Sequence, residues 1–305
     1  MDLSLAHIIL LFVAAIWAGA LNAIAGGGTF FTFPVLLLVG IPPIIANTTN
    51  KFALSFASIA GVVGFWKEIR AIRSKLLFFC SLGIIGSITG SIALLLTSAA
   101  QFEAMIPWLM LAATLLFALG NKVVGWLGSL SMRAEMIESR VESRESSKMS
   151  LREDEAVEAI QHQSKKTHNT QVFSKPYTSS LDSRLSTLTT SFFIGFAQFL
   201  IGIYGGFFAA GMGILMMALY ELAGMKNIHE MNALKSAVGL GINVVSAITF
   251  LMVGIINWHI ALILVAGALI GGYSGAILSK RLSPAIIRGF IVCYGTAMTV
   301  YFFVK

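Results

Sequence analysis

Ten apolar runs, separated by short polar breaks, limit how this chain of 305 residues can fold. Most of the runs have the roughly 20 residues that a helix needs to cross the hydrocarbon core of a bilayer. Because lipid offers no hydrogen-bond partners to the backbone, spanning segments of this kind form helices. We therefore predict an all-α polytopic membrane protein with about ten membrane segments. The runs cover residues 3–23, 30–39, 44–66, 76–96, 105–127, 185–203, 207–223, 228–256, 259–278 and 285–304.

The charged residues gather in one stretch of the chain. Residues 130–184 hold nine Lys or Arg and nine Asp or Glu, whereas the other 250 residues hold 12 and 5, and with them the whole net charge of +7. So few charges cannot cover a soluble globule of this size, which excludes an ordinary cytosolic enzyme, a disulfide scaffold and a disordered chain. Because the remaining basic residues lie mostly at the ends of apolar runs, they indicate a lipid bilayer as partner and no nucleic acid.

The chain before residue 130 and the chain after residue 184 repeat one another. A repeat of more than 100 residues is too long for a solenoid and has the size of half a transporter. We predict a first membrane repeat at residues 1–129, a charged insert at 130–184 and a second membrane repeat at 185–305. Glycines that recur in both halves are expected to let helices approach closely. The matching residues are Gly40 and Lys51 with Gly224 and Lys235, eleven positions apart in both halves, Gly86 and Gly90 with Gly271 and Gly275, and Gly26-Gly27 with Gly205-Gly206.

Loops at matching places in the two repeats differ in charge. The loop after the third run holds four basic residues between positions 67 and 75, but the matching loop at 254–258 holds none. By the positive-inside rule, these two loops lie on opposite sides of the membrane. We therefore predict two five-segment inverted repeats, with both termini outside and the insert in the cytoplasm. This arrangement requires the short second and seventh runs, which follow glycine-rich breaks, to cross the membrane. If they re-enter instead, the halves become parallel and the charge pattern has no explanation.

The insert has its own composition. Glu, Arg, Ser and Lys dominate residues 130–170, which favours a solvated helix supported by charge pairs four residues apart. Residues 164–184 are polar and are predicted to be flexible. The insert could bind a regulatory partner. We favour a tolerated loop expansion, because long surface insertions cost little free energy.

Two lysines occupy the same place in the two repeats. Lys51 lies about two turns into the third run and Lys235 about two turns into the eighth, which is roughly 10 Å deep at 1.5 Å per residue. An ammonium inside the hydrocarbon costs about 2.5–3.5 kcal/mol on insertion scales. A lysine near a helix end can instead extend to the interface. Two matched lysines, each beside asparagine, favour a binding role.

Gly26, Gly27 and Gly28 interrupt the apolar pattern before Thr29 and the short second run. The first N–H groups of a helix that starts there are free, and the helix dipole places partial positive charge on them. Interrupted helices of this kind form anion sites near the membrane midplane, although glycines also serve as plain packing notches. With Lys51 in the next run, we predict an anion cradle. The neutral side chains expected to contribute are Thr48, Thr49, Asn50, Asn232 and Asn243.

The remaining candidate residues carry weaker indications. His229 and Glu230 begin the eighth run and could relay protons, but a solvated loop explains them as well and is the reading that we favour. The sequence contains no H-E-x-x-H, G-x-S-x-G or Walker motif, so we expect no enzyme activity, metal or cofactor. Without an ATPase motif, transport would draw on an ion gradient, with H⁺ as a candidate coupling ion, or on the substrate's own gradient and the membrane potential.

The first half resembles the signature of the TauE/SafE sulfite exporter family, also called the toluenesulfonate-uptake permease family. The second half resembles that family's second copy more loosely, through Gly205-Gly206 and the region of Lys235. The chain departs from the pattern in its long insert and at Thr29, where the family often has a fourth glycine. The resemblance implies a bacterial transporter of small, often sulfur-containing anions. The resembling stretches are Ala25-Gly26-Gly27-Gly28-Thr29, Pro34, Gly40-Ile41-Pro42-Pro43 and Ala46-Asn47-Thr48-Thr49-Asn50-Lys51.

These patterns together predict a secondary active transporter that moves a small anion across the cytoplasmic membrane by alternating access of its two repeats. The anion is expected to bind between the halves, at Lys51 or Lys235 and at the N–H groups of Gly27, Gly28 and Thr29. Within transport, a channel-like anion conduit is the alternative. From a different class, the protein could be a membrane sensor or scaffold that acts through the insert.

Overall fold

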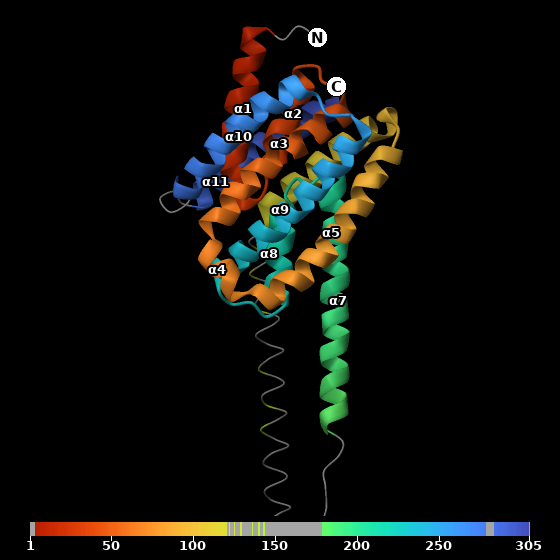
Figure 1. The fold of residues 1–305 in the computed structure, drawn as a ribbon, viewed down its shortest axis with the longest axis vertical. Helices are drawn as coiled ribbons and strands as arrows, with labels where there is room; N and C mark the ends of the chain where they lie inside the picture. Colours follow the sequence, from red (N-terminus) through yellow and green to blue (C-terminus); the bar gives the residue numbers. More distant parts are fainter. Residues whose placement is uncertain are drawn as a thin grey trace, which may run out of the picture. The chain divides into compact units, whose positions relative to one another are not determined.

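The computed structural model describes residues 4–120, 179–278 and 284–304, together with single positions between 122 and 143. Contacts group the chain into two units, one formed by Met1–Val124 with Phe192–Lys305 and the other by Gly125–Ser191. The first unit contains the bundle of apolar helices (Figure 1). Nearly all of the helix predicted at residues 130–170 lies outside the described residues.

Every regular element in the described part of the chain is an α-helix, which confirms the predicted all-α fold. Five of the described helices are long and apolar enough to cross a membrane, and shorter apolar helices accompany them. The polar breaks of the sequence form the connections. The helices are α1 (Leu5–Ala25), α2 (Gly28–Leu38), α3 (Pro43–Gly64), α4 (Trp66–Ala71), α5 (Arg73–Leu96), an unlabelled helix at Ala99–Gly120, α7 (Ser179–Phe207), α8 (Met212–Leu222), α9 (Ile228–Val253), α10 (Trp258–Leu278) and α11 (Pro284–Val304).

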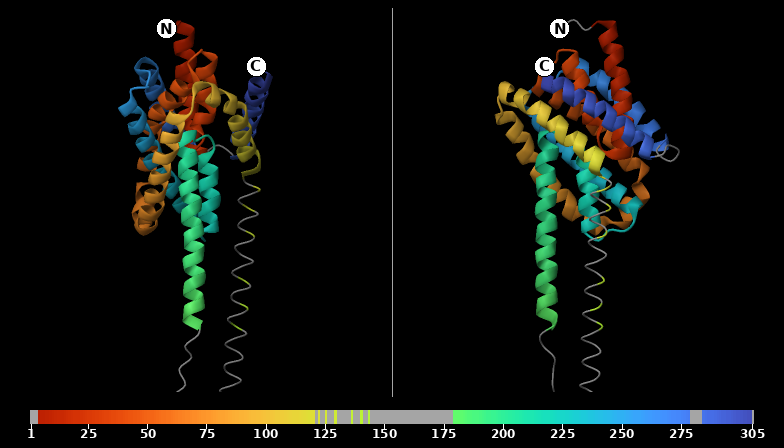
Figure 2. Two further views of the ribbon diagram at one scale, coloured as in Figure 1. Left: turned by 90° about the vertical axis from the view of Figure 1, so that its right-hand side faces the viewer. Right: turned by 180° about the vertical axis from the view of Figure 1, so that it is seen from behind.

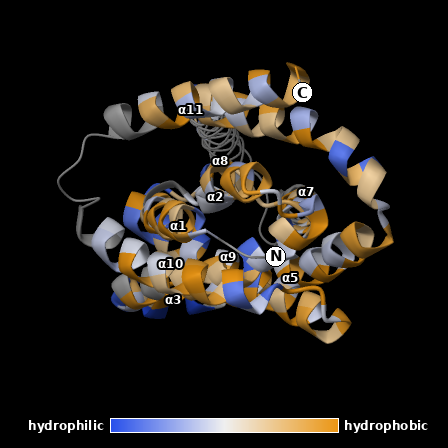
Figure 3. Ribbon diagram, turned by 90° about the horizontal axis from the view of Figure 1, so that it is seen from above, coloured by the Kyte–Doolittle hydropathy of each residue, from blue (hydrophilic) through white to orange (hydrophobic). Residues whose placement is uncertain are grey.

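Apolar residues cover the outside of the bundle, and a set of buried polar residues shares its interior with a hydrophobic core. The five consecutive residues from Asn47 to Lys51 are all buried, while Leu96 and Met252 are more than 80% exposed, at 81% and 84%. Hydrophobic residues occupy most of the described helices in the view from above (Figure 3). Lipid covers such a surface at no cost, so this distribution is that of a multi-pass membrane protein.

Glycines join α1 to α10 and α5 to α7. A β-carbon on Gly271 would lie 1.9 Å from the carbonyl oxygen of Ile16, and a β-carbon on Gly86 would lie 2.2 Å from the carbonyl oxygen of Phe199. The predicted role of these glycines in close helix packing is therefore confirmed. In each pair, the first helix of one half packs on the fourth helix of the other half, if the six-residue helix α4 is left out of the count. The contacts recur one turn further along, between Gly275 and Ala20 and between Gly90 and Ile203.

The helices α3 and α9 pack against each other in opposite directions. Thr48, near the start of α3, donates its Oγ1–H to the carbonyl of Ile255, just beyond the end of α9, over 3.2 Å. Beyond the other end of α3, Ile69 of α4 packs in one core cluster with Met231 near the start of α9. In Figures 1 and 2, α1 and the part of α7 that belongs to the bundle also run in opposite directions. Opposite directions of matching helices are what an inverted repeat requires.

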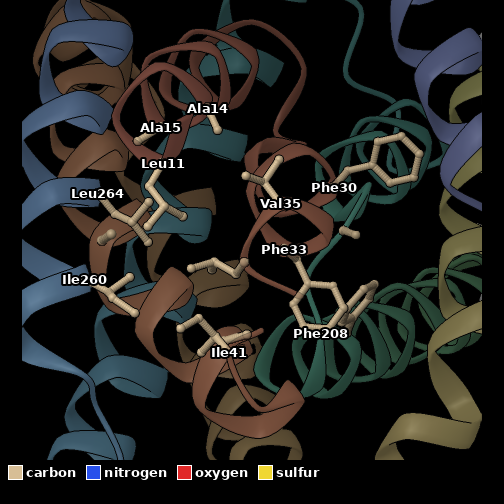
Figure 4. Packing of buried hydrophobic residues seen from close by; sticks show 14 of the residues in the cluster. Leu11, Ala14, Ala15, Phe30, Phe33, Val35, Ile41, Phe208, Ile260 and Leu264 are labelled. Carbon is tan, nitrogen blue, oxygen red and sulfur yellow. The ribbon is translucent and has the colours of Figure 1, made fainter. Parts of the chain in front are cut away.

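The first break in the helices lies where the sequence predicted it. The α1 helix ends at Gly26, whose φ of 70° is the left-handed conformation that glycine adopts without a steric penalty. The short α2 helix follows directly. Phe33 of α2 packs edge-on against Phe208, which belongs to the second break, with the ring centroids 5.2 Å apart (Figure 4). The two breaks are therefore neighbours in the core.

The second break does not lie at Gly205-Gly206, as the sequence had predicted. The α7 helix continues through both glycines, and the backbone turns at Ala209 and Gly211, with φ of 70° and 75°. A β-carbon on Gly206 would lie 2.2 Å from the carbonyl oxygen of Ser87, so this glycine is required by the contact with α5. Glycine serves both turns and close packing, and only the tertiary contacts decide which of the two applies here.

Candidate functional site

A small cavity lies where the first break meets α8 and α9. Its volume is about 30 Å³, which is room for about two waters at ~10–15 Å³ for each. Methionines of α8 contribute an apolar wall to the cavity, and polar side chains contribute a polar wall. The polar side chains that line it are Asn22 of α1, Ser58 of α3, and Lys235, Ser236 and Asn243 of α9.

Ser58 connects three helices at the polar wall. Its Oγ accepts from Asn22 Nδ2 and from Asn243 Nδ2, each over 3.1 Å. The hydroxyl donates to the carbonyl oxygen of Leu54 over 3.0 Å. One donor and two acceptor positions are all that a serine hydroxyl offers, so Ser58 is fully used in fixing the wall.

Replacing Ser58 by alanine is expected to destabilise the protein by about 1–3 kcal/mol, because the buried amide of Asn243 and the partly buried amide of Asn22 lose their acceptor. Unfolding of the purified protein in detergent, followed by circular dichroism, measures the effect. The matched control is Ser81→Ala, since Ser81 donates only to its own helix at an exposed position. Equal stability of the two variants would contradict the role of Ser58 as a connection between helices.

Lys235 supplies positive charge to the cavity. Its side chain is only 5% exposed, and Nζ donates to Oδ1 of Asn232 over 2.9 Å. Asn232 is held in turn, because its Nδ2 donates to the carbonyl of Ile228 over 3.0 Å. The described residues that line the cavity include no Asp or Glu. Lys235 is therefore the charged side chain among the described residues that line the cavity.

Gly26 brings the two broken segments together at this lysine. A β-carbon on Gly26 would lie 2.8 Å from Cα of Gly213 and 3.9 Å from Cδ of Lys235. The left-handed backbone and the contact with Gly213 both exclude a side chain here. Of Gly26, Gly27, Gly28 and Thr29 in the predicted cradle, the structure places Gly26 beside a lysine, and this lysine comes from the other half of the chain. The predicted contributors Asn232 and Asn243 lie at the same lysine and in the lining of the same cavity, respectively.

The other residues of the predicted cradle are occupied by packing. A β-carbon on Gly27 would lie 2.2 Å from Cζ of Phe117, and one on Gly28 would lie 2.6 Å from the carbonyl oxygen of Ala18. Thr29, in the first turn of α2, is buried. None of these three residues is among the described residues that line the cavity, so the structure does not bring their N–H groups to it.

Lys51 lies at the other break, apart from the cavity residues. It is 0% exposed, and its Nζ donates to the carbonyl of Gly205 over 2.7 Å and also to the carbonyl of Gly206. The last carbonyls of a helix carry partial negative charge, so a lysine is favourable there. Each of the two matched lysines therefore lies at the break of the opposite half of the chain.

The polar residues before Lys51 connect α3 to its neighbours. Asn47 Nδ2 donates to the carbonyl of Phe207 over 2.8 Å. Asn50 Oδ1 accepts from the hydroxyl of Thr32 in α2. Thr48 bonds to the connection after α9, as described above, and Thr49 Oγ1 accepts the backbone N–H of Asn257 in the same connection. These side chains position the broken helices, and none of them is among the described residues that line the cavity.

His229 and Glu230 lie in the first turn of α9. Asn227 forms the cap of this helix, because its Oδ1 accepts the backbone N–H of His229 over 3.0 Å and its Nδ2 donates to Glu230 over 3.3 Å. The side chain of His229 is exposed. Neither residue is among the described cavity residues, so the structure accounts for both as the start of a helix.

Sequence reasoning missed Asn22, Ser58 and Ser236. Two of them leave a trace in the sequence, because Asn22 stands one turn before Gly26 and Ser58 stands about two turns after Lys51. Ser236 simply follows Lys235. Within the described ranges, no three His, Cys, Asp or Glu side chains come close enough together to hold a metal ion.

An all-α bundle of membrane-length helices, with two broken segments that meet beside a buried lysine, has the architecture of a multi-pass membrane transporter. The sequence profile of the family described as Sulfite exporter TauE/SafE matches residues 11–302. The chain belongs to this family. The profile covers both breaks and both lysines.

Curated relatives support the same class. A protein of Haemophilus influenzae named "Probable membrane transporter protein" is 26% identical over 301 residues, which is 98% of this chain and 95% of the relative. "Probable membrane transporter protein ORF9" of a Sinorhizobium species is 23% identical over 98% of this chain and 93% of its own length. "Probable membrane transporter protein YfcA" of Escherichia coli is 29% identical over 37% of this chain and 42% of its own. No solved structure matches the chain significantly.

Proposed function

We propose that this protein is a secondary transporter for a small, sulfur-containing anion, such as sulfite or a sulfonate, which binds at Lys235 and crosses by alternating access of the two halves. The observation that carries this proposal is the buried ammonium of Lys235 at a polar cavity whose described lining residues include no carboxylate. The description of the family supports sulfite and its relatives as the first anions to test.

Charge and hydrogen bonding both favour an anion in this cavity. Holding an ammonium away from water is costly unless acceptors or an opposite charge compensate it, and Asn232 supplies one acceptor. A bound anion would supply the opposite charge. The side chains of Ser236 and Asn243, which also line the cavity, carry donors for its oxygens. A cation would meet the ammonium instead and be repelled.

The size of the cavity restricts the substrate. A volume of about 30 Å³ suits a species of few atoms. In this proposal a larger anion enters only as α8 moves, because the flexible side chains of Met212 and Met216 form the apolar wall. Inorganic sulfur anions therefore fit the observed conformation better than sulfonates with a carbon tail.

We also infer that the protein lies in the cytoplasmic membrane with residues 130–184 on the cytoplasmic side. Lys67 and Arg70 of α4 and Arg73 at the start of α5 are all exposed, which supports a cytoplasmic face at this end of α3. The driving force in the proposal is an ion gradient, with H⁺ as the coupling ion to test, because the sequence contains no ATPase motif.

Thermal stability in the presence of anions tests the binding site. A ligand at 100 times its Kd stabilises a protein by about 2.7 kcal/mol. Purified protein is heated with sulfite, sulfate, thiosulfate, taurine or acetate. One class of anion is expected to raise the Tm of the wild type and of the control Lys67→Met, but not that of Lys235→Met; both variants lose one positive charge. If no anion raises the Tm of the wild type, or if an anion still raises the Tm of Lys235→Met, the result would count against the proposal.

A further inference from the structure

Donors from two other helices hold the last turn of α7. The carbonyl oxygens of Gly205 and Gly206 accept from Nζ of Lys51. That of Gly206 also accepts a weaker, shared hydrogen bond from Oγ of Ser91 over 3.4 Å, because the same hydroxyl donates to Ser246 over 3.0 Å. The carbonyl of Phe207 accepts from Asn47 over 2.8 Å. Lys51 and Asn47 come from α3, and Ser91 comes from α5. The end of α7 is therefore fixed just before the second break.

Lys51 is the strongest of these donors. Hydrogen bonds from an ionised donor are roughly twice as strong as neutral ones, and the final carbonyls of a helix carry partial negative charge. Because Lys51 is 0% exposed, water does not screen this attraction. The two carbonyls occupy two of the three N–H donors of the ammonium. In this conformation Lys51 is committed to the backbone of α7.

The break that Lys51 holds corresponds to the break at the cavity. Ile16 and Phe199 occupy matching places, since each lies against a glycine of the partner helix. Ten residues after Ile16 stands Gly26, ten residues after Phe199 stands Ala209, and both have a φ of 70°. Alanine adopts this left-handed conformation only with strain, and such strain persists where surrounding contacts enforce it. The carbonyls of α7 that are held in this way lie two to four residues before Ala209.

Two buried polar atoms beside Lys51 lack a hydrogen-bond partner among the described residues. They are Oδ1 of Asn47 and Nδ2 of Asn50. In native structures, buried polar groups nearly always have a hydrogen-bond partner. The polar stretch of α3 is thus incompletely satisfied in this arrangement, and it retains hydrogen-bonding capacity for a different position of the end of α7.

We propose that Lys51 is a latch, which holds the α7–α8 break closed while the cavity at Lys235 is formed and which releases Gly205 and Gly206 before the opposite side opens. Lys51 is then a positioning residue, which sets the balance between two conformations and does not bind the anion. This inference rests on the proposed transport function, but its direct readout is the exposure of the second break, which needs no substrate.

The accessibility of position 210 measures whether the second break is open, because Ala210 lies in this break and is buried. With Cys80 and Cys293 replaced by alanine, Ala210→Cys is labelled with a maleimide, and Ser236→Cys at the cavity serves as the matched probe. Lys51→Met keeps the length of the side chain and removes the donor. We expect at least tenfold faster labelling at position 210, since bonds from charged donors are lost. In Lys51→Met, the labelling rate at position 236 and the Kd for the anion should both stay within twofold of their values in the protein that keeps Lys51.

Several outcomes would overturn the latch. Unchanged labelling at position 210 would show that Lys51 does not hold the break, and an equal rise at positions 210 and 236 would show general loosening. Loss of anion binding in Lys51→Met would make Lys51 a ligand. Absence of anion binding in every protein, including the wild type, would overturn the proposed function, while the labelling ratio would still decide whether Lys51 holds the break.

A second variant covers the case in which Lys51→Met does not fold. Asn47→Ala removes the neighbouring donor to Phe207 and leaves Lys51 in place. Labelling at position 210 is then expected to rise about threefold, the factor for an average hydrogen bond within a membrane protein. No rise in this folded variant would overturn the proposal.

Discussion

Transport of the anion is expected to fall by about 10- to 150-fold when Lys235 is replaced by methionine. This factor corresponds to about 1.5–3 kcal/mol for a hydrogen bond to a charged group. Methionine keeps most of the volume of lysine and removes the ammonium, so the packing of α9 against the cavity is largely retained. Uptake of a radiolabelled anion into proteoliposomes, at concentrations below half-saturation of the wild type, measures the loss.

Two comparisons separate the loss of the site from a general loss of charge or of fold. Lys67→Met removes an equally charged but exposed lysine of α4 and is expected to transport at the wild-type rate. Lys235→Met should elute from a sizing column as the wild type does, which excludes misfolding. Wild-type uptake by Lys235→Met would remove this residue from the binding site. Equal losses in both variants would point to the overall charge of the protein instead.

Most of the fold follows from local properties of the sequence. The length and composition of the apolar runs determine the helices, and glycines at Gly86 and Gly271 mark where helices touch. Gly26 marks the first break, because its backbone needs the left-handed conformation there. The second break was misplaced. Gly205-Gly206 has the composition of a break, but contact with Ser87 of α5 uses Gly206 for close packing, and Ala209 accepts the strained turn instead.

The candidate site could be predicted only in part. A lysine deep in an apolar run is costly, and this cost singles out Lys51 and Lys235 without knowledge of the fold. Their partners could not be predicted, because Lys51 meets Gly205 across 154 positions of sequence, and only the packing of the two halves determines that contact. Asn22 and Ser58 were missed for a related reason. A lone asparagine or serine in an apolar helix is ordinary, and these two become a site only when three helices converge.

The largest expected effect on stability is at Gly271, where even alanine does not fit. A β-carbon there would lie 1.9 Å from the carbonyl oxygen of Ile16 and 2.8 Å from its Cα, which are backbone atoms that cannot rotate away. The helices α1 and α10 must separate, and overpacking of this kind costs about 1–3 kcal/mol or more. Unfolding in detergent should show a Tm for Gly271→Ala several degrees below that of the wild type.

Gly289 offers a matched control on α11, because no atom of the described residues outside its own helix backbone and chain neighbours lies within 4 Å of the place where its β-carbon would be. Alanine is favoured over glycine in a helix by up to about 1 kcal/mol, and this gain applies equally at both positions. Gly289→Ala should therefore be as stable as the wild type or more so. The repeat adds a second test, since Gly86 meets Phe199 as Gly271 meets Ile16, and Gly86→Ala should lose a similar amount of stability. A stable Gly271→Ala would show that α1 and α10 do not touch at this glycine. Losses at Gly271 but not at Gly86 would show that the two halves are not packed alike.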